Sequence, residues 1–343
     1  MDKIRQSWAT SSDSAAQSIS EKIRTCWRRI WTGSGPEKDA YEPTIKIRTN
    51  PSGRILKPDR SIMVGPHEPE YFTDHERRGR VYIFNHASFK KYSKRDGSNE
   101  DVLNLKDALP KLGFRAEDIT SFDNFTLDQI EEKLEEISQD DHSNCDMMVV
   151  FVLTHGEQDG KLHAYDREYT VNEIWEHFTA DRCKSLVGKP KIFFIIACRG
   201  NKMDKGETIQ VQTRKMSVTE IDAVRCQKTV SYTIPVWADF LTIYSTMEGY
   251  YSYRNPAEGT WYIQALCQEI KNFKQPNMHF LDFLTRVTRK VATSYQTMFD
   301  DPRLNNKKQC PFITSSLTKV INLKLMKTAT DSVSEKERPK SYN

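Results

Sequence analysis

Two short apolar runs, each followed closely by a reactive side chain, constrain the fold of this chain more than any other feature. The first covers 147–154 and is followed by His155, and the second covers 192–197 and is followed by Cys198. Short apolar runs between turn signals predict strands that are buried on both faces, as in a parallel sheet. Catalytic groups gather at the carboxyl ends of such strands, so we expect the imidazole and the thiol to meet at one edge.

The 43 positions from His155 to Cys198 leave room for a crossover helix between the two strands. A thiol is a good nucleophile as the thiolate, and a nearby imidazole promotes that state. Gly156 would leave a backbone N–H open to a developing oxyanion. Taken one at a time, these residues have simpler explanations, because a cysteine on a buried strand is usually a small core residue and a histidine there is usually structural.

The residues around both positions resemble a known family. Ala197-Cys198-Arg199-Gly200 resembles the caspase nucleophile motif, and Thr154-His155-Gly156-Glu157 resembles the caspase histidine motif. Further similar stretches extend the resemblance from about residue 78 to about residue 325, and it is greatest to executioner-type caspases with short prodomains. The resemblance implies an α/β caspase-like sandwich. Its mostly parallel central sheet would be flanked by helices, and the chain would be cleaved into large and small subunits.

The resemblance also implies a reaction, the hydrolysis of peptide bonds after aspartate. Cys198 would attack the carbonyl carbon that follows the aspartate. His155 would handle the protons, donating to the leaving amine rather than acting within a tight triad. The backbone N–H groups of Gly156 and Cys198 would hold the oxyanion.

The resemblance assigns the substrate aspartate to two arginines, Arg95 and Arg254, with Tyr251, Ser252 and Tyr253 lining the neighbouring pockets. Two arginines on one carboxylate form charge-assisted, geometrically selective contacts. Without the resemblance, Arg95 would be interpreted as a solvated loop residue and Arg254 as a loop arginine packed on tyrosines.

One residue departs from the family pattern, since Ile196 stands where the family has a glutamine in the substrate pocket. A hydrogen bond to a charged group contributes about 1.5–3 kcal/mol. Its loss would lower catalytic efficiency by roughly tenfold to a hundredfold, and the branched side chain would narrow the pocket. We therefore expect a slow or selective protease. The alternative is a catalytically weak caspase-like regulator, acting as a decoy or as a heterodimer partner of a true caspase.

Composition excludes several other classes of protein. The net charge of +4 is too mild to argue for nucleic-acid binding. Seven cysteines without a Cys-x-x-Cys pair are typical of a reducing compartment, so we expect a cytoplasmic protein. The sequence has no apolar run of about 18 residues and no signal-peptide core. No ligand cluster has usable spacing, so neither a metal nor an organic cofactor is expected.

The first 76 residues differ in composition from the rest and are expected to be a flexible arm. Within it, 18–32 predicts a short basic amphipathic helix with Trp27 and Trp31 on its apolar face. Such a helix would lie on a membrane surface or dock a partner, or it would fold back on the protein or form only transiently. A membrane-tethered interaction protein, with the protease domain as cargo, is therefore a second alternative.

The remaining chain divides by composition and by resemblance into four regions. They are a large-subunit region at 77–200, a linker at 201–233, a small-subunit region at 234–328 and a flexible tail at 329–343. Within the folded regions we expect strands at 81–85, 147–154, 192–197 and 238–246 and a final apolar edge strand from 311 to 325. Helices are expected at 99–112, 126–138, 171–178, 260–273 and from about 280, and Pro110 should kink or end the first of them.

The linker contains Asp222 before an alanine, with a glutamate two positions upstream, which fits cleavage by a caspase. Asp39 is a weaker site of the same kind, at which the arm would be removed. The simpler interpretation of Asp222 is a solvated acidic turn. As a caspase-like zymogen, the protein would act in apoptosis as a homodimer of large and small subunit pairs. Its partners would be protein substrates with exposed aspartates, an upstream caspase and inhibitor-of-apoptosis proteins.

Overall fold

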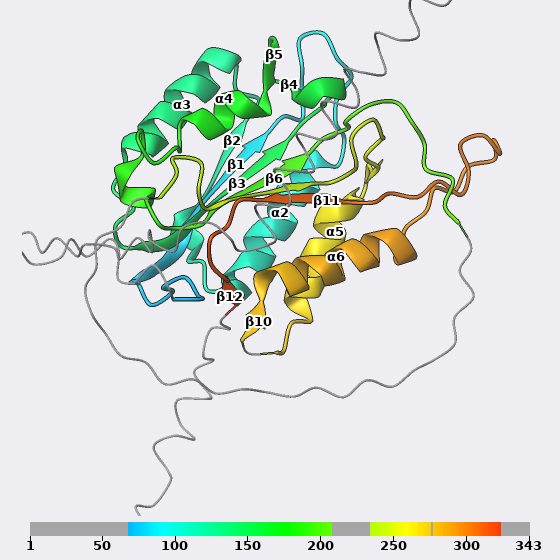
Figure 1. Cartoon of the computed structure of the whole chain (residues 1–343). Coiled ribbons are helices and arrows are strands. Elements are labelled where there is room, and N and C mark those ends of the chain that lie inside the picture. The colour runs from blue at the N-terminus through cyan, green and yellow to red at the C-terminus, as the bar shows by residue number, and fades with distance from the viewer. Residues whose placement is uncertain (1–67, 208–233, 276, 324–343) are drawn as a thin grey trace, which may run out of the picture. The chain divides into compact units, whose positions relative to one another are not determined.

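The computed structural model describes residues 68–207, 234–275 and 277–323, all of which belong to one unit, Ile47–Asn343. Its centre is a six-stranded sheet in the order β11-β7-β6-β3-β1-β2 (Figure 1). The strands are β1 (Arg77–Asn85), β2 (Ile119–Asp123), β3 (Cys145–Leu153), β6 (Lys191–Ile196), β7 (Phe240–Tyr244) and β11 (Phe312–Ser315). All neighbours pair in parallel except β11, which runs antiparallel to β7. The predicted α/β fold with a mostly parallel central sheet is confirmed.

Helices cover both faces of this sheet (Figure 1). One face carries α3 (Leu127–Gln139) and α4 (Val171–Glu176), and the other carries α2 (Ser98–Ala108), α5 (Trp261–Lys271) and α6 (Phe280–Ser294). The α3 helix begins as its sequence predicts, because Thr126 and Gln129 form a reciprocal capping box.

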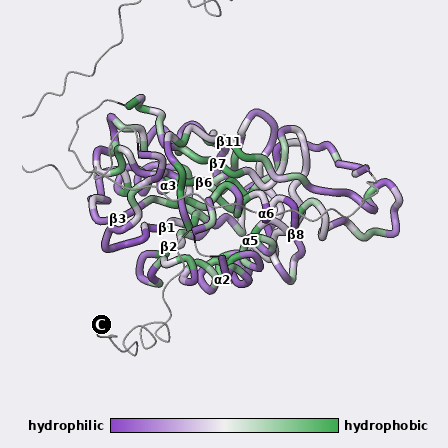
Figure 2. Tube along the Cα trace, turned by 60° about the horizontal axis from the view of Figure 1, so that its bottom comes forward, coloured by the Kyte–Doolittle hydropathy of each residue, from purple (hydrophilic) through white to green (hydrophobic). Residues whose placement is uncertain are grey.

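Alternation along the central strands divides the core into two layers. On β6, Ile192, Phe194 and Ile196 join the cluster under α2, α5 and α6. Phe193 and Ile195, on the opposite face of the same strand, join the cluster under α3 and α4. Figure 2 shows the hydrophobic residues gathered in the centre and the hydrophilic ones outside. Because both faces are covered, the carboxyl edge of the sheet is left to hold polar chemistry.

Short two-stranded ladders complete the fold. They are β4 (Lys161–His163) with β5 (Glu168–Thr170), β8 (Arg254–Asn255) with β9 (Gly259–Thr260), and β10 (Met278–His279) with β12 (Asn322–Leu323). No helix among residues 68–207, 234–275 and 277–323 is both long and apolar enough to cross a membrane.

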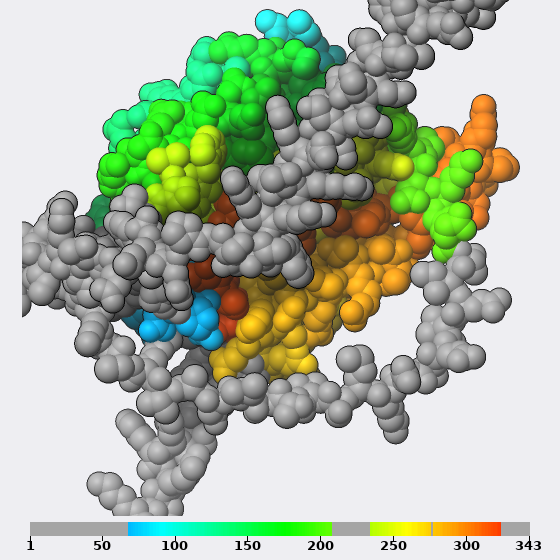
Figure 3. Space-filling view, viewed as in Figure 1, coloured from blue at the N-terminus to red at the C-terminus, as the bar shows by residue number. Residues whose placement is uncertain are grey.

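The predicted final strand from 311 to 325 is wrong as one element. After β11, Ser316 turns the chain by donating its backbone N–H to the carbonyl of Phe240 and accepting from the N–H of Asp239. The chain then pairs with the first described residues, where Tyr71 and Val320 are hydrogen-bonded, before it reaches β12. Figure 3 shows these first residues, in blue, against the last ones, in red. On the side of β7, the sheet therefore ends in the short strand β11, while β2 is the edge strand on the other side.

The helix expected at 99–112 ends at Ala108, and a 3-10 turn over Leu109–Leu112 follows. The prediction that Pro110 would kink or end this helix is confirmed. The sequence patterns also gave no signal for β2, whose five residues are only partly buried.

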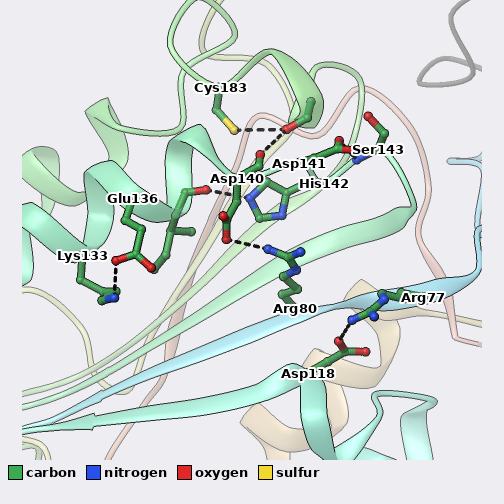
Figure 4. A network of polar contacts seen from close by, with 12 residues as sticks. Arg77, Arg80, Asp118, Lys133, Glu136, Asp140, Asp141, His142, Ser143 and Cys183 are labelled. Carbon is green, nitrogen blue, oxygen red and sulfur yellow. Dashed lines mark hydrogen bonds and ion pairs between the residues drawn. The ribbon is translucent and has the colours of Figure 1, made fainter.

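Ion pairs and hydrogen bonds fix the amino edge of the sheet (Figure 4). Arg80 of β1 lies 2.6 Å from the carboxylate of Asp140 at the end of α3, and Arg77 pairs with Asp118. The imidazole of His142 lies 2.8 Å from the carbonyl of Ile137. These contacts lie at the amino ends of the strands, whereas His155 and Cys198 lie at the carboxyl ends. We therefore interpret them as contacts that stabilise the fold and do not take part in the candidate site.

Candidate active site

The structure brings the predicted histidine and cysteine to one edge of the sheet. Strands β3 and β6 are parallel neighbours, and the last pair in their register joins Leu153 to Ile196. His155 and Cys198 each follow two residues beyond these ends. A Cβ atom on Gly156 would lie 2.4 Å from the carbonyl oxygen of Cys198, so the close approach of the two loops requires glycine there. The prediction that both strands end at the same edge is confirmed.

His155 is oriented by a backbone group rather than by a carboxylate. Its Nε2 lies 2.9 Å from the carbonyl oxygen of Ser93, which can only accept, so Nε2 carries the proton and Nδ1 is left as the basic nitrogen. The ring also packs against Phe89, with 4.7 Å between ring centroids. Burial lowers the pKa of His155, and Arg95 and Arg254 lower it further. The ring is therefore neutral at pH 7.

The Cys198 thiol has a different partner from the imidazole. Its Sγ accepts from the backbone N–H of Ser252 at 3.4 Å and lies 3.6 Å from the carbonyl oxygen of the same residue. Burial raises the pKa of Cys198, while the Ser252 backbone and the nearby arginines Arg95 and Arg254 act in the opposite direction. The thiol is therefore protonated at rest, and the nucleophile has to be generated when substrate is bound.

Arg95 is almost completely buried, with only 3% of its surface exposed. Its Nη1 donates to Ser98 Oγ at 2.6 Å, and that hydroxyl donates in turn to Asn85 Oδ1 at 2.5 Å. Burial lowers the pKa of Arg95 to about 9, and repulsion by Arg254 is the second cause. The guanidinium is thus a cation at pH 7 that is held in place by a buried hydroxyl and lacks a hydration shell.

Arg254 reaches the same place from the small-subunit region. Its Nε donates to the carbonyl oxygen of Asp96 at 2.7 Å. Burial lowers the pKa of Arg254, while Asp101 and Cys198 act in the opposite direction. Asp96 directly follows Arg95, Ser93 contacts His155, and Ser252 contacts Cys198. The segments that carry the two arginines therefore border the imidazole and the thiol.

The segment before Arg254 lies alongside Cys198. Ser252 contacts the thiol as described, and the backbone N–H of Tyr251 donates to the carbonyl of Lys202 at 3.0 Å. The ring of Tyr253 packs in a tilted arrangement against Trp261, with 4.7 Å between ring centroids. These residues border the candidate site, and their contacts with substrate stay predictions.

Ile196 is fully buried and belongs to the core cluster that contains Phe194 and Tyr262. It lies on the same face of β6 as Phe194, two residues before Cys198. The side chain therefore packs as a core residue, and its predicted effect on the substrate pocket stays a prediction.

Three residues that hold the site were not singled out from the sequence: Ser93, Ser98 and Asp101. Ser93 acts through its backbone carbonyl, for which no side-chain signal exists. Ser98 and Asp101 lie in the first turn of α2, where a polar residue is usually solvated, but both are fully buried. The predicted cleavage sites Asp222 and Asp39, and the helix at 18–32 with Trp27 and Trp31, lie outside the described residues.

Comparisons with known proteins give one consistent answer. A family model described as "Caspase domain" matches residues 78–322. Caspase-1 of Spodoptera frugiperda is 38% identical over 84% of this chain and 90% of its own length, and Caspase drICE of Drosophila melanogaster is 38% identical over 80% and 78%. Caspase-6 of Gallus gallus is 38% identical over 73% and 82%. The crystal structure of the Spodoptera protein superposes with a TM-score of 0.68 at 37% identity, covering 78% of this chain and 98% of that one.

Proposed function

Because the chain belongs to the caspase family, we propose that it is a cysteine endopeptidase that cleaves protein substrates after aspartate and acts in programmed cell death. The observation that carries this proposal is that the segments of two arginines, Arg95 and Arg254, hydrogen-bond to each other and contact the imidazole of His155 and the thiol of Cys198. An uncharged substrate side chain would leave the buried Arg95 and the partly buried Arg254 without a carboxylate partner, so the pocket favours aspartate.

The chemistry follows from the resting hydrogen bonds. The substrate's aspartate binds the two arginines, and its peptide carbonyl lies over Cys198. The thiol gives its proton to Nδ1 of His155, and Sγ attacks the carbonyl carbon. The backbone N–H groups of Gly156 and Cys198 then stabilise the oxyanion. His155 gives the proton to the leaving amine, the C–N bond breaks, and water hydrolyses the thioester to release the acid and restore the thiol.

The N–H···O bond from His155 to Ser93 supports the proposed role of the histidine. It fixes Nε2 as the protonated nitrogen and leaves Nδ1 available to receive a proton. A carboxylate partner would stabilise the imidazolium, whereas a backbone carbonyl mainly orients the ring. The histidine therefore serves as a proton carrier that does not stay charged.

We further propose that the protein is made as a zymogen. Cleavage at Asp222 in the 201–233 linker would separate the large subunit from the small one, and cleavage at Asp39 would remove the arm. Within the caspase family the active form is a dimer of large and small subunit pairs. The short antiparallel edge strand β11, with Phe312 exposed, supports pairing between two copies at this edge.

The arm and the location of the protein are part of the same proposal. We place the protein in the cytoplasm, with peripheral attachment to membranes through Trp27 and Trp31. Liposome flotation of the wild type and of a Trp27→Glu, Trp31→Glu variant tests the attachment, which is wrong if both proteins float equally.

The activity itself is tested with protein that has been cut at Asp222. Hydrolysis of fluorogenic peptides ending in Asp, Glu and Asn is compared for the wild type, Arg254→Gln and the control Arg303→Gln, whose side chain is exposed. We expect aspartate-selective turnover that Arg254→Gln reduces by about tenfold to a hundredfold, since the lost contact is charge-assisted. Equal turnover of the three peptides by the wild type would refute the proposed specificity.

A further inference from the structure

A buried carboxylate joins the two elements that carry the arginines. Asp101 lies in the first turn of α2, and none of its surface is exposed. Its Oδ1 accepts the backbone N–H of Thr260 at 2.8 Å. Thr260 lies in β9, directly opposite Arg254 in the β8–β9 register. Arg95 is tied to the same end of α2, because its carbonyl accepts the N–H of Ser98 at 3.1 Å.

The packing around Asp101 leaves little freedom for either element. A Cβ atom on Gly259 would lie 2.2 Å from Asp101 Oδ1, and a Cβ atom on Gly97 would lie 2.6 Å from the carbonyl oxygen of Asn255. Gly97 also has φ of 85°, a conformation that favours glycine. The beginning of α2 and the β8–β9 hairpin are therefore in close contact. Asp101 joins them through its hydrogen bond to Thr260, in addition to the bond from Arg254 Nε to the carbonyl of Asp96.

The negative charge of Asp101 attracts the same two arginines that would bind the carboxylate of a substrate aspartate. It interacts favourably with Arg95 and with Arg254. From α5, the titratable group that faces it is the Cys267 thiol, whose pKa burial raises to about 12, so that it stays neutral. Its second oxygen, Oδ2, has no hydrogen-bond partner among the described residues. Asp101 is thus a counter-charge to the arginine pair without being hydrogen-bonded to either one.

We propose that Asp101 is a positioning residue that sets the affinity of the aspartate pocket in two opposing ways. Its hydrogen bond to Thr260 holds the Arg254 hairpin in place, which favours binding of the substrate carboxylate. Its negative charge offsets one of the two positive charges, which weakens the same binding. This inference rests on the proposed function, since it assumes that the arginines receive an aspartate.

The two roles are separable by substitution. Asp101→Asn keeps an acceptor oxygen for Thr260 and removes the charge, so we expect aspartyl peptides to bind more tightly. Asp101→Ala removes both, so the hairpin loses its anchor and binding weakens. A carboxylate with only a structural role would give weaker or unchanged binding in both variants. Tighter binding by Asp101→Asn together with weaker binding by Asp101→Ala therefore identifies the effect of the charge.

The experiment measures binding without turnover. Full-length Cys198→Ala protein, cut at Asp222, is titrated with a fluorescein-labelled tetrapeptide amide ending in aspartate, and Kd is read by anisotropy. At pH 7.5 we expect Asp101→Asn to lower Kd about three- to tenfold. This is the size of effect expected when one negative charge is removed from a partly desolvated site that binds a carboxylate. Glu100→Gln, an exposed carboxylate next in sequence, is the matched control and should leave Kd unchanged.

Two further arms make the assignment specific. Burial raises the pKa of Asp101 to about 6, so at pH 5 the carboxyl group of the parent protein is mostly neutral. At that pH the Kd values of the parent and of Asp101→Asn for the aspartyl peptide should differ by less than about twofold. A peptide ending in asparagine should bind the parent and the Asn variant equally, because it carries no charge for the pocket to attract. Thermal melting of each variant checks that it is folded.

The outcomes separate this inference from the proposed function. If the parent protein prefers aspartyl over asparaginyl peptide but Asp101→Asn fails to bind the aspartyl peptide more tightly, the charge role of Asp101 is wrong and the proposed function stands. If the parent protein has no preference for the aspartyl peptide, the proposed function is wrong, and so is the proposed role of Asp101, which depends on it. Should Asp101→Ala not fold, the comparison of Asp101→Asn with Glu100→Gln still decides.

Discussion

The Nε2 proton of His155 is donated to the backbone carbonyl of Ser93 across 2.9 Å, while Cys198 Sγ is hydrogen-bonded to the backbone of Ser252. The general base and the nucleophile are thus hydrogen-bonded to different residues. The thiol is neutral because burial raises its pKa, and the imidazole is neutral because burial lowers its pKa. Substrate binding has to bring the two together, so we expect the rate of acylation to depend on how well the pocket is filled.

The pH dependence of kcat/KM follows from His155. Its neutral form accepts the thiol proton, and its pKa lies below the ordinary value of 6.5, with burial as the largest cause. Activity should therefore persist as the pH falls through 6.5 and be lost only at lower pH. A profile of kcat/KM against pH checks this. An acid limb centred above pH 6.5 would show that the imidazole is stabilised as a cation and would contradict this account.

Ser98→Ala should weaken substrate binding without abolishing catalysis. The hydroxyl accepts from Arg95 Nη1 at 2.6 Å and is fully buried, so its loss leaves a buried guanidinium without one of its partners. We expect KM for aspartyl peptides to rise about tenfold, since a hydrogen bond to a charged group contributes about 1.5–3 kcal/mol. Steady-state kinetics measures the effect, with the exposed Ser294→Ala as control. An unchanged KM would mean that Arg95 is positioned by other contacts.

Ile196→Gln should raise catalytic efficiency and lower the stability of the protein. Restoring the family's glutamine would add a hydrogen bond to the substrate and raise kcat/KM by roughly tenfold or more. The side chain is fully buried among apolar residues, so an amide without a partner in the free protein would lower the free energy of unfolding by about 1–3 kcal/mol.

Urea unfolding and peptide kinetics measure the two effects on the same Ile196→Gln protein. Ile196→Leu, which keeps the apolar contacts, is the control for the change in shape. Slower turnover by the glutamine variant would argue against the interpretation of Ile196 as an attenuating residue.

His86 should make the protein acid-sensitive. It is fully buried beside Arg95, and burial lowers its pKa to about 3 from 6.5. The unfolded chain binds a proton near pH 6.5 but the folded protein does not, so stability is lost as the pH falls below 6.5. At pH 5 the loss should be about 2 kcal/mol, from 1.36 kcal/mol for each pH unit below the unfolded pKa.

Urea unfolding at pH 7 and pH 5 checks this for the wild type and His86→Asn. The variant should lose less stability between the two pH values than the wild type does. His279→Gln, at an exposed histidine, should behave like the wild type. If all three proteins lose the same stability, another group is responsible for the acid sensitivity.

The sequence predicted the parts of the fold that local pattern controls. The apolar runs before His155 and Cys198 are buried parallel strands, and the capping box of Thr126 and Gln129 begins α3 as expected. The split of the last strand was missed, because it depends on hydrogen bonds from Ser316 to residues about 75 positions earlier, which no local pattern records.

The site was predictable only in its reactive side chains. Cys198 and His155 stood out by chemistry, and the arginines only by resemblance. Ser93 contributes a backbone oxygen, and Asp101 gains its role from burial against Thr260, some 159 positions away. Contacts of this kind become visible only when the fold has placed the two segments together.

The decisive experiment is covalent capture of the nucleophile, which shows whether Cys198 attacks substrates that end in aspartate. Wild-type and Cys198→Ala proteins, both cut at Asp222, are incubated with a peptide chloromethyl ketone ending in aspartate and with its asparagine counterpart, and intact masses are recorded alongside hydrolysis of an aspartyl peptide. We expect one adduct, on Cys198, that forms faster with the aspartyl reagent, and we expect Cys198→Ala to lose hydrolysis by at least about a thousandfold. Hydrolysis by Cys198→Ala at the wild-type rate, or labelling of the exposed thiol of Cys310 in place of Cys198, would show that Cys198 is not the nucleophile.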